Sequence, residues 1–174
     1  MKMNLTLDST VILNNEVEMP RLGLGTWKVK GKAAIKAVQW ALDAGYRHID
    51  TAKLYGNETE IGDVLIESQV SRDEIFLTSK VWDTDQGYDA TLKAFEKTTG
   101  RLRTHYLDLY LIHWPRKKRN ETWRAMETLL DEGKVRAIGV ANFYIHHLEE
   151  LMNKFDITPA VNQFELNPFL YRDE

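Results

Sequence analysis

From Leu22 onward, short apolar segments alternate with longer amphipathic segments, and no other feature limits the possible folds as strongly. The apolar segments have the length and hydrophobicity of buried β-strands, at residues 22–27, 48–51, 75–81, 107–113, 135–142 and 160–166. The segments between them repeat apolar residues at helical spacing, near residues 31–44, 57–69, 87–102, 120–132 and 144–153. Six strands that are each followed by a helix, or by the start of one, favour parallel βαβ units.

Two folds are built from such units, and the glycine pattern after the first strand separates them. A doubly wound nucleotide-binding sheet should show Gly-x-Gly-x-x-Gly or a P-loop at that point. Gly23 and Gly25 supply the first two glycines, but Lys28 stands where the third is needed. We therefore predict an α/β fold of the (β/α)8 TIM-barrel type, which needs no glycine fingerprint and carries its chemistry at the C-terminal ends of its strands.

The chain is shorter than a complete barrel. Eight βα units typically take about 250 residues, whereas this chain has 174 residues and ends after its sixth predicted strand. We expect one incomplete barrel domain over residues 1–174, with βα units one to six over residues 22–174 and the sixth helix missing. An N-terminal β-hairpin is predicted at residues 5–20, where apolar alternation surrounds an Asn-Asn turn.

The stretch from His48 to Glu58 leaves a strand, crosses a short loop and enters a helix. Asn57 is predicted to cap that helix, with Glu60 three residues later in capping-box spacing. Gly45 and Gly133 follow two other predicted helices, where glycine commonly ends a helix.

Composition excludes several classes of function. The chain contains no cysteine, so disulfides, thiolate catalysis and cysteine-ligated metals are excluded. Its formal net charge is −3 with both signs interspersed, which favours neither nucleic acid nor an anionic membrane as a partner. The N-terminus lacks the apolar core of a signal peptide, and no segment approaches the length of a membrane span. We expect a cytoplasmic globular protein.

Reactive side chains fall at the exits of three successive predicted strands. Residues two apart share a face of a strand, which groups His48 with Asp50, Phe76 with Thr78, Lys80 and Trp82, and Leu107 with Leu109, Leu111 and His113. A barrel would therefore bring Asp50, Lys80 and His113 together at its C-terminal mouth, with Tyr55 reaching in from a loop. Taken singly, each of these residues could be structural, and His113 could be a core histidine. Packing alone, however, does not require four reactive groups at successive strand ends.

These four residues suit the reduction of a carbonyl group. Hydride delivery to the carbonyl carbon leaves an alkoxide, which needs a proton and a polar environment. Tyr55 can donate the proton, and a nearby Lys80 ammonium is expected to lower the phenol's pKa from its ordinary value of about 10. Asp50 would hold Lys80 charged and in place, and His113 would orient the carbonyl oxygen.

Seven segments resemble the aldo-keto reductase family and occur in the family's order. They are Gly23-Leu-Gly-Thr-Trp27, Gly45-Tyr-Arg-His-Ile-Asp-Thr-Ala52, Tyr55-Gly-Asn-Glu58, Thr78-Ser-Lys-Val-Trp82, Tyr106-Leu-Asp-Leu-Tyr-Leu-Ile-His-Trp-Pro115, Ile138-Gly-Val-Ala-Asn-Phe143 and Val161-Asn-Gln-Phe-Glu-Leu-Asn-Pro168. The resemblance implies that Asp50, Tyr55, Lys80 and His113 form the family's catalytic tetrad.

The same resemblance implies a cofactor and a substrate pocket. The cofactor would be NADPH or NADH, with Asn142 and Gln163 on the nicotinamide carboxamide and Gly25, Thr26 and Asp50 also at the binding site. A pocket for a small-molecule carbonyl substrate would be lined by three tryptophans, Trp27, Trp82 and Trp114.

The implied activity is NAD(P)H-dependent reduction of aldehydes or ketones to alcohols. Because two barrel units are absent, we expect this chain by itself to be weakly active or inactive, and to self-associate or accept a complementary segment through its open edges. The alternative is a non-catalytic barrel relative, such as a regulatory or cofactor-binding subunit, or an inactive fragment. A metal-dependent barrel hydrolase is disfavoured, because no cluster of carboxylates and histidines gathers at the strand ends.

Overall fold

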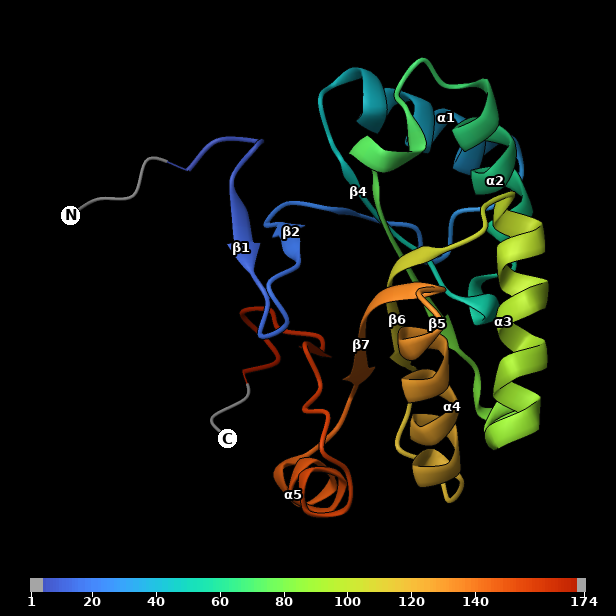
Figure 1. Cartoon of the computed structure of the whole chain (residues 1–174). Helices are drawn as coiled ribbons and strands as arrows, with labels where there is room; N and C mark the ends of the chain where they lie inside the picture. The colour runs from blue at the N-terminus through green and yellow to red at the C-terminus, as the bar shows by residue number, and fades with distance from the viewer. Residues whose placement is uncertain (1–4, 172–174) are drawn as a thin grey trace.

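The computed structural model describes residues 5–171 and contains two sheets (Figure 1). The first is an antiparallel hairpin of β1 (Thr10–Ile12) and β2 (Glu18–Pro20). The second is a six-stranded sheet whose strands lie in chain order, β3 (Leu24–Gly25), β4 (His48–Asp50), β5 (Phe76–Val81), β6 (Leu107–Ile112), β7 (Val135–Ala141) and β8 (Asn162–Gln163). The first sheet confirms the predicted N-terminal hairpin. All neighbouring strands of the second sheet are parallel, which confirms an incomplete (β/α) barrel.

Within residues 5–171, five α-helices and three short 3-10 helices connect the strands. The α-helices are α1 (Lys32–Asp43), α2 (Glu58–Glu67), α3 (Tyr88–Leu102), α4 (Arg119–Asp131) and α5 (Ile145–Lys154). The 3-10 helices are η1 (Lys53–Tyr55), η2 (Arg72–Glu74) and η3 (Asp83–Asp85). In Figure 1, α1 to α3 lie to the right of the sheet, and the hairpin lies to its left.

The outermost strands of the parallel sheet are shorter than the sequence pattern predicted. β3 covers two residues of the predicted 22–27, and β8 covers two residues of the predicted 160–166. Each has a hydrogen-bonded neighbour on one side only, so fewer backbone bonds hold it in the extended conformation. The inner strands, which have two neighbours, match their predicted ranges to within one residue.

The larger hydrophobic core lies between the sheet and the helices. Tyr110 and Ile112 of β6 point into it, where the Tyr110 ring meets the edge of Phe95 from α3 and Trp123 of α4 is fully buried. Full burial of one large apolar side chain contributes about 1.5–3 kcal/mol, so this layer is the main source of stability.

A smaller core covers the opposite face of the sheet, under the hairpin. Phe76, Leu109 and Leu111 point to this side, as their alternation predicted, and pack with Leu13 of the hairpin. Leu107 was expected there too, but it packs with the outer core, at the first residue of β6 where the chain enters the sheet.

The hairpin turn is tied to the amino ends of the last strands. The Asn14 side chain donates to the Thr158 carbonyl at 3.2 Å, and the Asn15 side chain donates to the Arg136 carbonyl at 2.8 Å. The hairpin therefore occupies the amino-terminal end of the strands and leaves their carboxyl ends to the loops that carry the reactive residues.

Asn57 occupies the predicted N-cap position of α2, but its side chain does not cap the helix. The Asn57 side chain makes no cap hydrogen bond, because it is fully buried and bonded to other segments. The Glu60 carboxylate accepts from the Gly31 amide at 3.0 Å rather than from the start of its own helix. The predicted helix ends are correct, since Gly45 and Gly133 follow α1 and α4 with φ of 94° and 68°.

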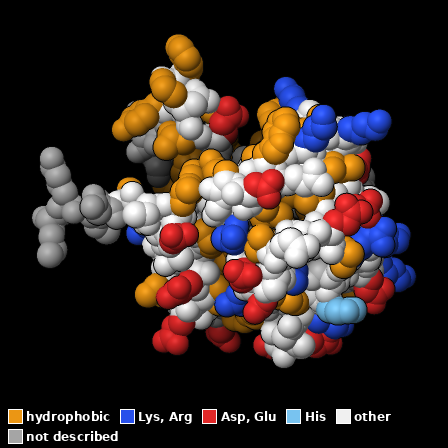
Figure 2. All heavy atoms as spheres, turned by 90° about the horizontal axis from the view of Figure 1, so that it is seen from above, with side chains coloured by type: hydrophobic (Ala, Val, Ile, Leu, Met, Phe, Trp, Pro, Cys, Tyr) orange, Lys and Arg blue, Asp and Glu red, His pale blue; other side chains and the backbone are white. Residues whose placement is uncertain are grey.

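Several large hydrophobic side chains remain exposed near the strand ends and in the last described segment. They are Leu22, Trp27, Leu54, Trp114, Phe164, Leu166, Phe169 and Tyr171. Figure 2 shows the molecule from above, the side on which the strands of Figure 1 begin, and hydrophobic side chains gather around a hollow there. Within residues 5–171, none of the helices combines the length and the apolar character needed to cross a membrane.

Candidate active site

Asp50 and Lys80 meet at the carboxyl ends of two neighbouring strands. Asp50 is the last residue of β4, and Lys80 lies on the face of β5 that turns away from the helices. The Lys80 ammonium lies 2.5 Å from Oδ1 of Asp50 and also donates to the Thr51 carbonyl at 3.0 Å. The Lys80 side chain is 1% exposed, and a buried ammonium is costly unless it is paired in this way.

Tyr55 reaches the same point from the loop after β4. Its hydroxyl lies 3.4 Å from the Lys80 ammonium, which also contacts Asp50. Tyr55 ends η1, and Gly56 then takes a left-handed conformation with φ of 64° that turns the chain into α2. A non-glycine residue adopts that conformation only at a cost, so this glycine helps to fix the position of the loop.

Asn57 anchors the loop that carries Tyr55. Its buried side-chain amide donates to the carbonyls of Thr26 and Val29, at 2.8 and 2.9 Å, and accepts from the Thr51 hydroxyl at 2.8 Å. These bonds join the loop after β3 to the loop after β4. Local sequence indicates a helix cap for Asn57 and not this anchoring role, because Thr26 and Val29 come from a segment about 30 residues earlier.

Burial and Asp50 together raise the pKa of Tyr55 to about 12. This corrects the expectation that Lys80 lowers the phenol's pKa. The reason is geometric, because the ammonium is closest to Asp50, whose carboxylate offsets its charge, while the phenol itself loses water. Burial also lowers the pKa of Lys80, and the attraction of Asp50 opposes that change.

His113 follows the last residue of β6 and lies beside Tyr55. The two ring centroids are 5.8 Å apart in an edge-to-face arrangement. Burial, with a smaller effect of Lys80, lowers the pKa of His113 to about 4, so the imidazole is neutral at physiological pH. Its Nδ1 is buried, and it has no hydrogen-bond partner in the part of the chain that the structure describes.

Asn142 and Gln163 stand at the carboxyl ends of β7 and β8, beside the other residues. The Asn142 side chain donates to the His113 carbonyl at 3.0 Å, and the Gln163 side chain donates to Oδ2 of Asp50 at 2.9 Å. Each amide is held through its nitrogen, and its oxygen accepts no hydrogen bond from any described residue. Two such oxygens fit a carboxamide, which has N–H groups to donate.

Gly25 and Thr26 reach the site through backbone contacts with Asp50. Gly25 pairs with Asp50 across β3 and β4, and a side chain at Gly25 would meet no atom within 4 Å. The Thr26 amide and hydroxyl both bond to the Asp50 carbonyl at 3.0 Å. The contacts of Thr26 therefore position Asp50, while a contact of Gly25 or Thr26 with a cofactor stays a prediction.

Of the three tryptophans, the structure brings only Trp82 into contact with the four reactive residues. Its ring lies 5.1 Å from the His113 ring, edge to face. Trp27 is exposed beneath the ammonium of Lys28, and Trp114 is partly exposed beside Arg116. A substrate pocket lined by all three stays a prediction.

A buried carboxylate that sequence analysis did not assign supports β5 from the helix side. Glu58, the first residue of α2, accepts from the Ser79 hydroxyl at 2.7 Å and forms an ion pair with Arg101 at 2.6 Å. Ser79 precedes Lys80 and points to the opposite face, so the Glu58 contact helps to hold the lysine's strand. Within residues 5–171, no group of three or more histidines, cysteines or acidic residues could hold a metal ion.

This fold and site define an incomplete parallel (β/α) barrel with an aspartate, a tyrosine, a lysine and a histidine grouped at the strand ends. The Aldo/keto reductase family model matches residues 21–174, and the chain belongs to that family. Among curated proteins it is 55% identical to glyoxal reductase of Bacillus subtilis, covering 99% of this chain and 63% of that protein. It is 54% identical to the 9,11-endoperoxide prostaglandin H2 reductase of Trypanosoma cruzi, covering 91% of this chain and 56% of that protein.

Solved structures agree with this assignment. An aldo/keto reductase from Brucella melitensis superimposes with a TM-score of 0.92 at 48% identity, covering 95% of this chain and 66% of the other. A Bombyx mori aldo-keto reductase in complex with NADP superimposes with a TM-score of 0.91 at 32% identity, covering 97% of this chain and 62% of the other. The chain thus spans about 60% of the length of the relatives it matches.

Proposed function

We propose that the chain carries the catalytic half of an NADPH-dependent reductase that converts small aldehydes or ketones to alcohols. One observation carries this proposal, namely the continuous line of contacts from Asp50 through Lys80 to the Tyr55 hydroxyl, beside a neutral His113. A phenol, an ammonium and a neutral imidazole around one point are the groups that an alkoxide forming at that point would need.

In the proposed mechanism, Tyr55 is the proton donor. A reduced nicotinamide, held by the side-chain amides of Asn142 and Gln163, would supply the hydride. His113 then holds the carbonyl oxygen by a ring N–H, and the Tyr55 hydroxyl gives its proton to that oxygen as charge develops there. The phenolate that remains lies 3.4 Å from the Lys80 ammonium, which stabilises it until a proton returns from water.

The raised pKa of Tyr55 keeps the phenol in the protonated form that reduction requires. With a pKa of about 12, the phenol is protonated throughout the physiological range and always ready to donate. Alcohol oxidation would need the phenolate instead, and its population rises only as the pH approaches that value. We propose reduction as the working direction.

The cofactor assignment rests on the two amides and on relatives. Asn142 and Gln163 present unpaired oxygens next to Asp50 and His113, which suits the carboxamide of a nicotinamide ring. The Bombyx mori relative was solved with NADP and another aldo-keto reductase with NADPH, so we propose NADPH as the cofactor. The glyoxal reductase relative suggests a small dicarbonyl as a first test substrate.

We propose that the chain taken alone turns over such substrates weakly. β3 and β8 end the parallel sheet, each with a neighbour on one side only, and hydrophobic side chains near them are exposed. Open strand edges and exposed apolar surface favour pairing with another chain or segment. We expect either self-association or a gain of activity when the two further βα units are supplied.

The proposed function can be tested in a completed barrel. The chain is fused to the remaining C-terminal segment of the Bacillus subtilis relative, and NADPH oxidation is followed with glyoxal. The fusion should be active, and Tyr55→Phe should lose nearly all turnover while NADPH binding, measured by fluorescence, is retained. Tyr88→Phe is the matched control, because Tyr88 is an exposed residue of α3 whose hydroxyl bonds to Thr128 rather than to any of the four reactive residues. Equal turnover in the Tyr55→Phe fusion would refute the assignment of the donor.

A further inference from the structure

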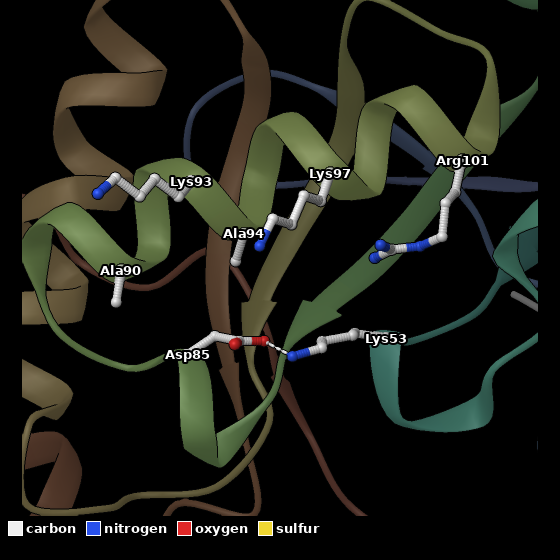
Figure 3. Close-up of a pocket in the computed structure, with 7 residues that line it drawn as sticks. All are labelled: Lys53, Asp85, Ala90, Lys93, Ala94, Lys97 and Arg101. Atoms are coloured by element: carbon white, nitrogen blue, oxygen red, sulfur yellow. Dashed lines mark hydrogen bonds and ion pairs between the residues drawn. The ribbon is translucent and has the colours of Figure 1, made fainter.

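A second concave site lies outside the tetrad, between α3 and the two 3-10 helices that follow β4 and β5. It has a volume of about 200 Å³ and contains none of the four reactive residues. Its lining consists of Lys53, Asp85, Ala90, Lys93, Ala94, Lys97 and Arg101 (Figure 3). Four of these seven residues are cationic and one is acidic, so the pocket has an excess of positive charge in a protein whose net charge is −3.

Two of the four cations already form ion pairs with carboxylates. Lys53 forms an ion pair with Asp85, and Arg101 forms one with the buried Glu58. Within residues 5–171, Lys93 and Lys97 form no ion pair, so the pocket keeps two uncompensated positive charges.

The positions on α3 concentrate this charge along one side of the helix. Lys93, Lys97 and Arg101 are spaced four residues apart, which stacks like charges on one face, an arrangement that disfavours the helix unless an anion is present. Ala90 and Ala94 lie beside them and leave room below. In Figure 3, Lys97 and Arg101 point toward the space above the Lys53–Asp85 pair, and Lys93 points away along the helix.

We propose that this pocket binds a phosphate group, held by Lys97, Lys53 and Arg101 with Lys93 at its rim. A phosphate monoester carries a charge between about −1.5 and −2 near neutral pH, which matches the two uncompensated cations. The pocket is smaller than the roughly 300–1,000 Å³ of sites for drug-sized ligands, so it takes the phosphate rather than a whole large molecule. The phosphate is either a free ion or part of a small metabolite.

Binding is tested on the purified 174-residue chain without any nicotinamide, so the result is independent of the proposed reductase activity. Inorganic phosphate and glycerol 3-phosphate are titrated separately into isotopically labelled protein, and amide chemical shifts are followed by NMR. We expect saturable shifts in η1, η3 and α3 with at least one probe, and the tighter probe identifies the source of the phosphate. Sodium chloride at equal ionic strength controls for general screening.

Two variants make the test specific. Lys97→Gln should weaken phosphate binding at least about tenfold, as loss of one charge-assisted bond predicts. Lys36→Gln, on the exposed side of α1, should leave it unchanged. The spectra report whether each variant is folded. The proposal is overturned if sodium chloride reproduces the shifts, if no probe saturates, or if Lys97→Gln binds as tightly as the Lys36→Gln control.

Discussion

Replacement of Lys80 by methionine tests whether the Asp50–Lys80 contact holds the site together. Methionine keeps the length and most of the volume of the lysine stem, so the variant removes charge without opening a large cavity. The variant leaves Asp50, whose side chain is 15% exposed, with Gln163 as its remaining side-chain donor. It also leaves the Thr51 carbonyl without the bond from the ammonium.

The expected loss is large relative to the total stability. Removing one partner of a buried ion pair typically costs about 3–5 kcal/mol, because the other charge stays buried without compensation. A domain has only about 5–15 kcal/mol in total, so Lys80→Met should unfold at a much lower urea concentration. Unfolding is followed by tryptophan fluorescence at low protein concentration, which limits association through the open edges.

A double variant separates loss of the pair from loss of packing. In Lys80→Met/Asp50→Asn the stranded carboxylate is gone, so part of the stability should return, with a coupling between the two positions of about 0.5–3 kcal/mol. Lys36→Met, an exposed lysine of α1, should change stability by less than about 0.5 kcal/mol. The reasoning fails if Lys80→Met is as stable as the unchanged chain, or if adding Asp50→Asn restores nothing.

Three further predictions concern stability. Burial lowers the pKa of His113 from 6.5 to about 4, so the unfolded chain binds more protons than the folded chain between these pH values. The free energy of unfolding should therefore fall as the pH drops through this window, by up to about 3 kcal/mol. In urea titrations at several pH values, the stability of His113→Gln should depend less on pH. Gly62→Ala should lower the free energy of unfolding by about 1–3 kcal/mol, because its new Cβ would lie 2.3 Å from the Arg101 carbonyl oxygen. Gly100→Ala meets nothing within 4 Å, so it should raise the free energy of unfolding by about 0.5–1 kcal/mol. Thermal unfolding that shows the same sign for both glycines would contradict this packing argument. Asn57→Ala removes three hydrogen bonds and should cost roughly 3 kcal/mol in urea, and a loss below 1 kcal/mol would show that water replaces them.

The fold could be predicted from the sequence because its elements depend on local patterns. A strand buried on both faces needs a nearly continuous apolar run, as in β6, where Asp108 is the one charged residue. A helix against a sheet needs apolar residues at helical spacing, as in α1. These patterns placed five helices and four inner strands to within about two residues. Alternation along β5 and β6 also put Lys80 and Leu111 on the same side of the sheet.

What the sequence determined by itself was therefore the order of the elements and which residues stand at strand ends. Only the tertiary structure decided their environment, because burial and distance depend on segments far apart in the chain. Asn57 looks like a helix cap but binds Thr26, about 30 residues earlier. Tyr55 was expected to be acidified by Lys80, yet burial and Asp50 raise its pKa, since the charge of the ammonium is offset at its closest contact. No local pattern contains those distances, so no reading of neighbouring residues could have supplied them.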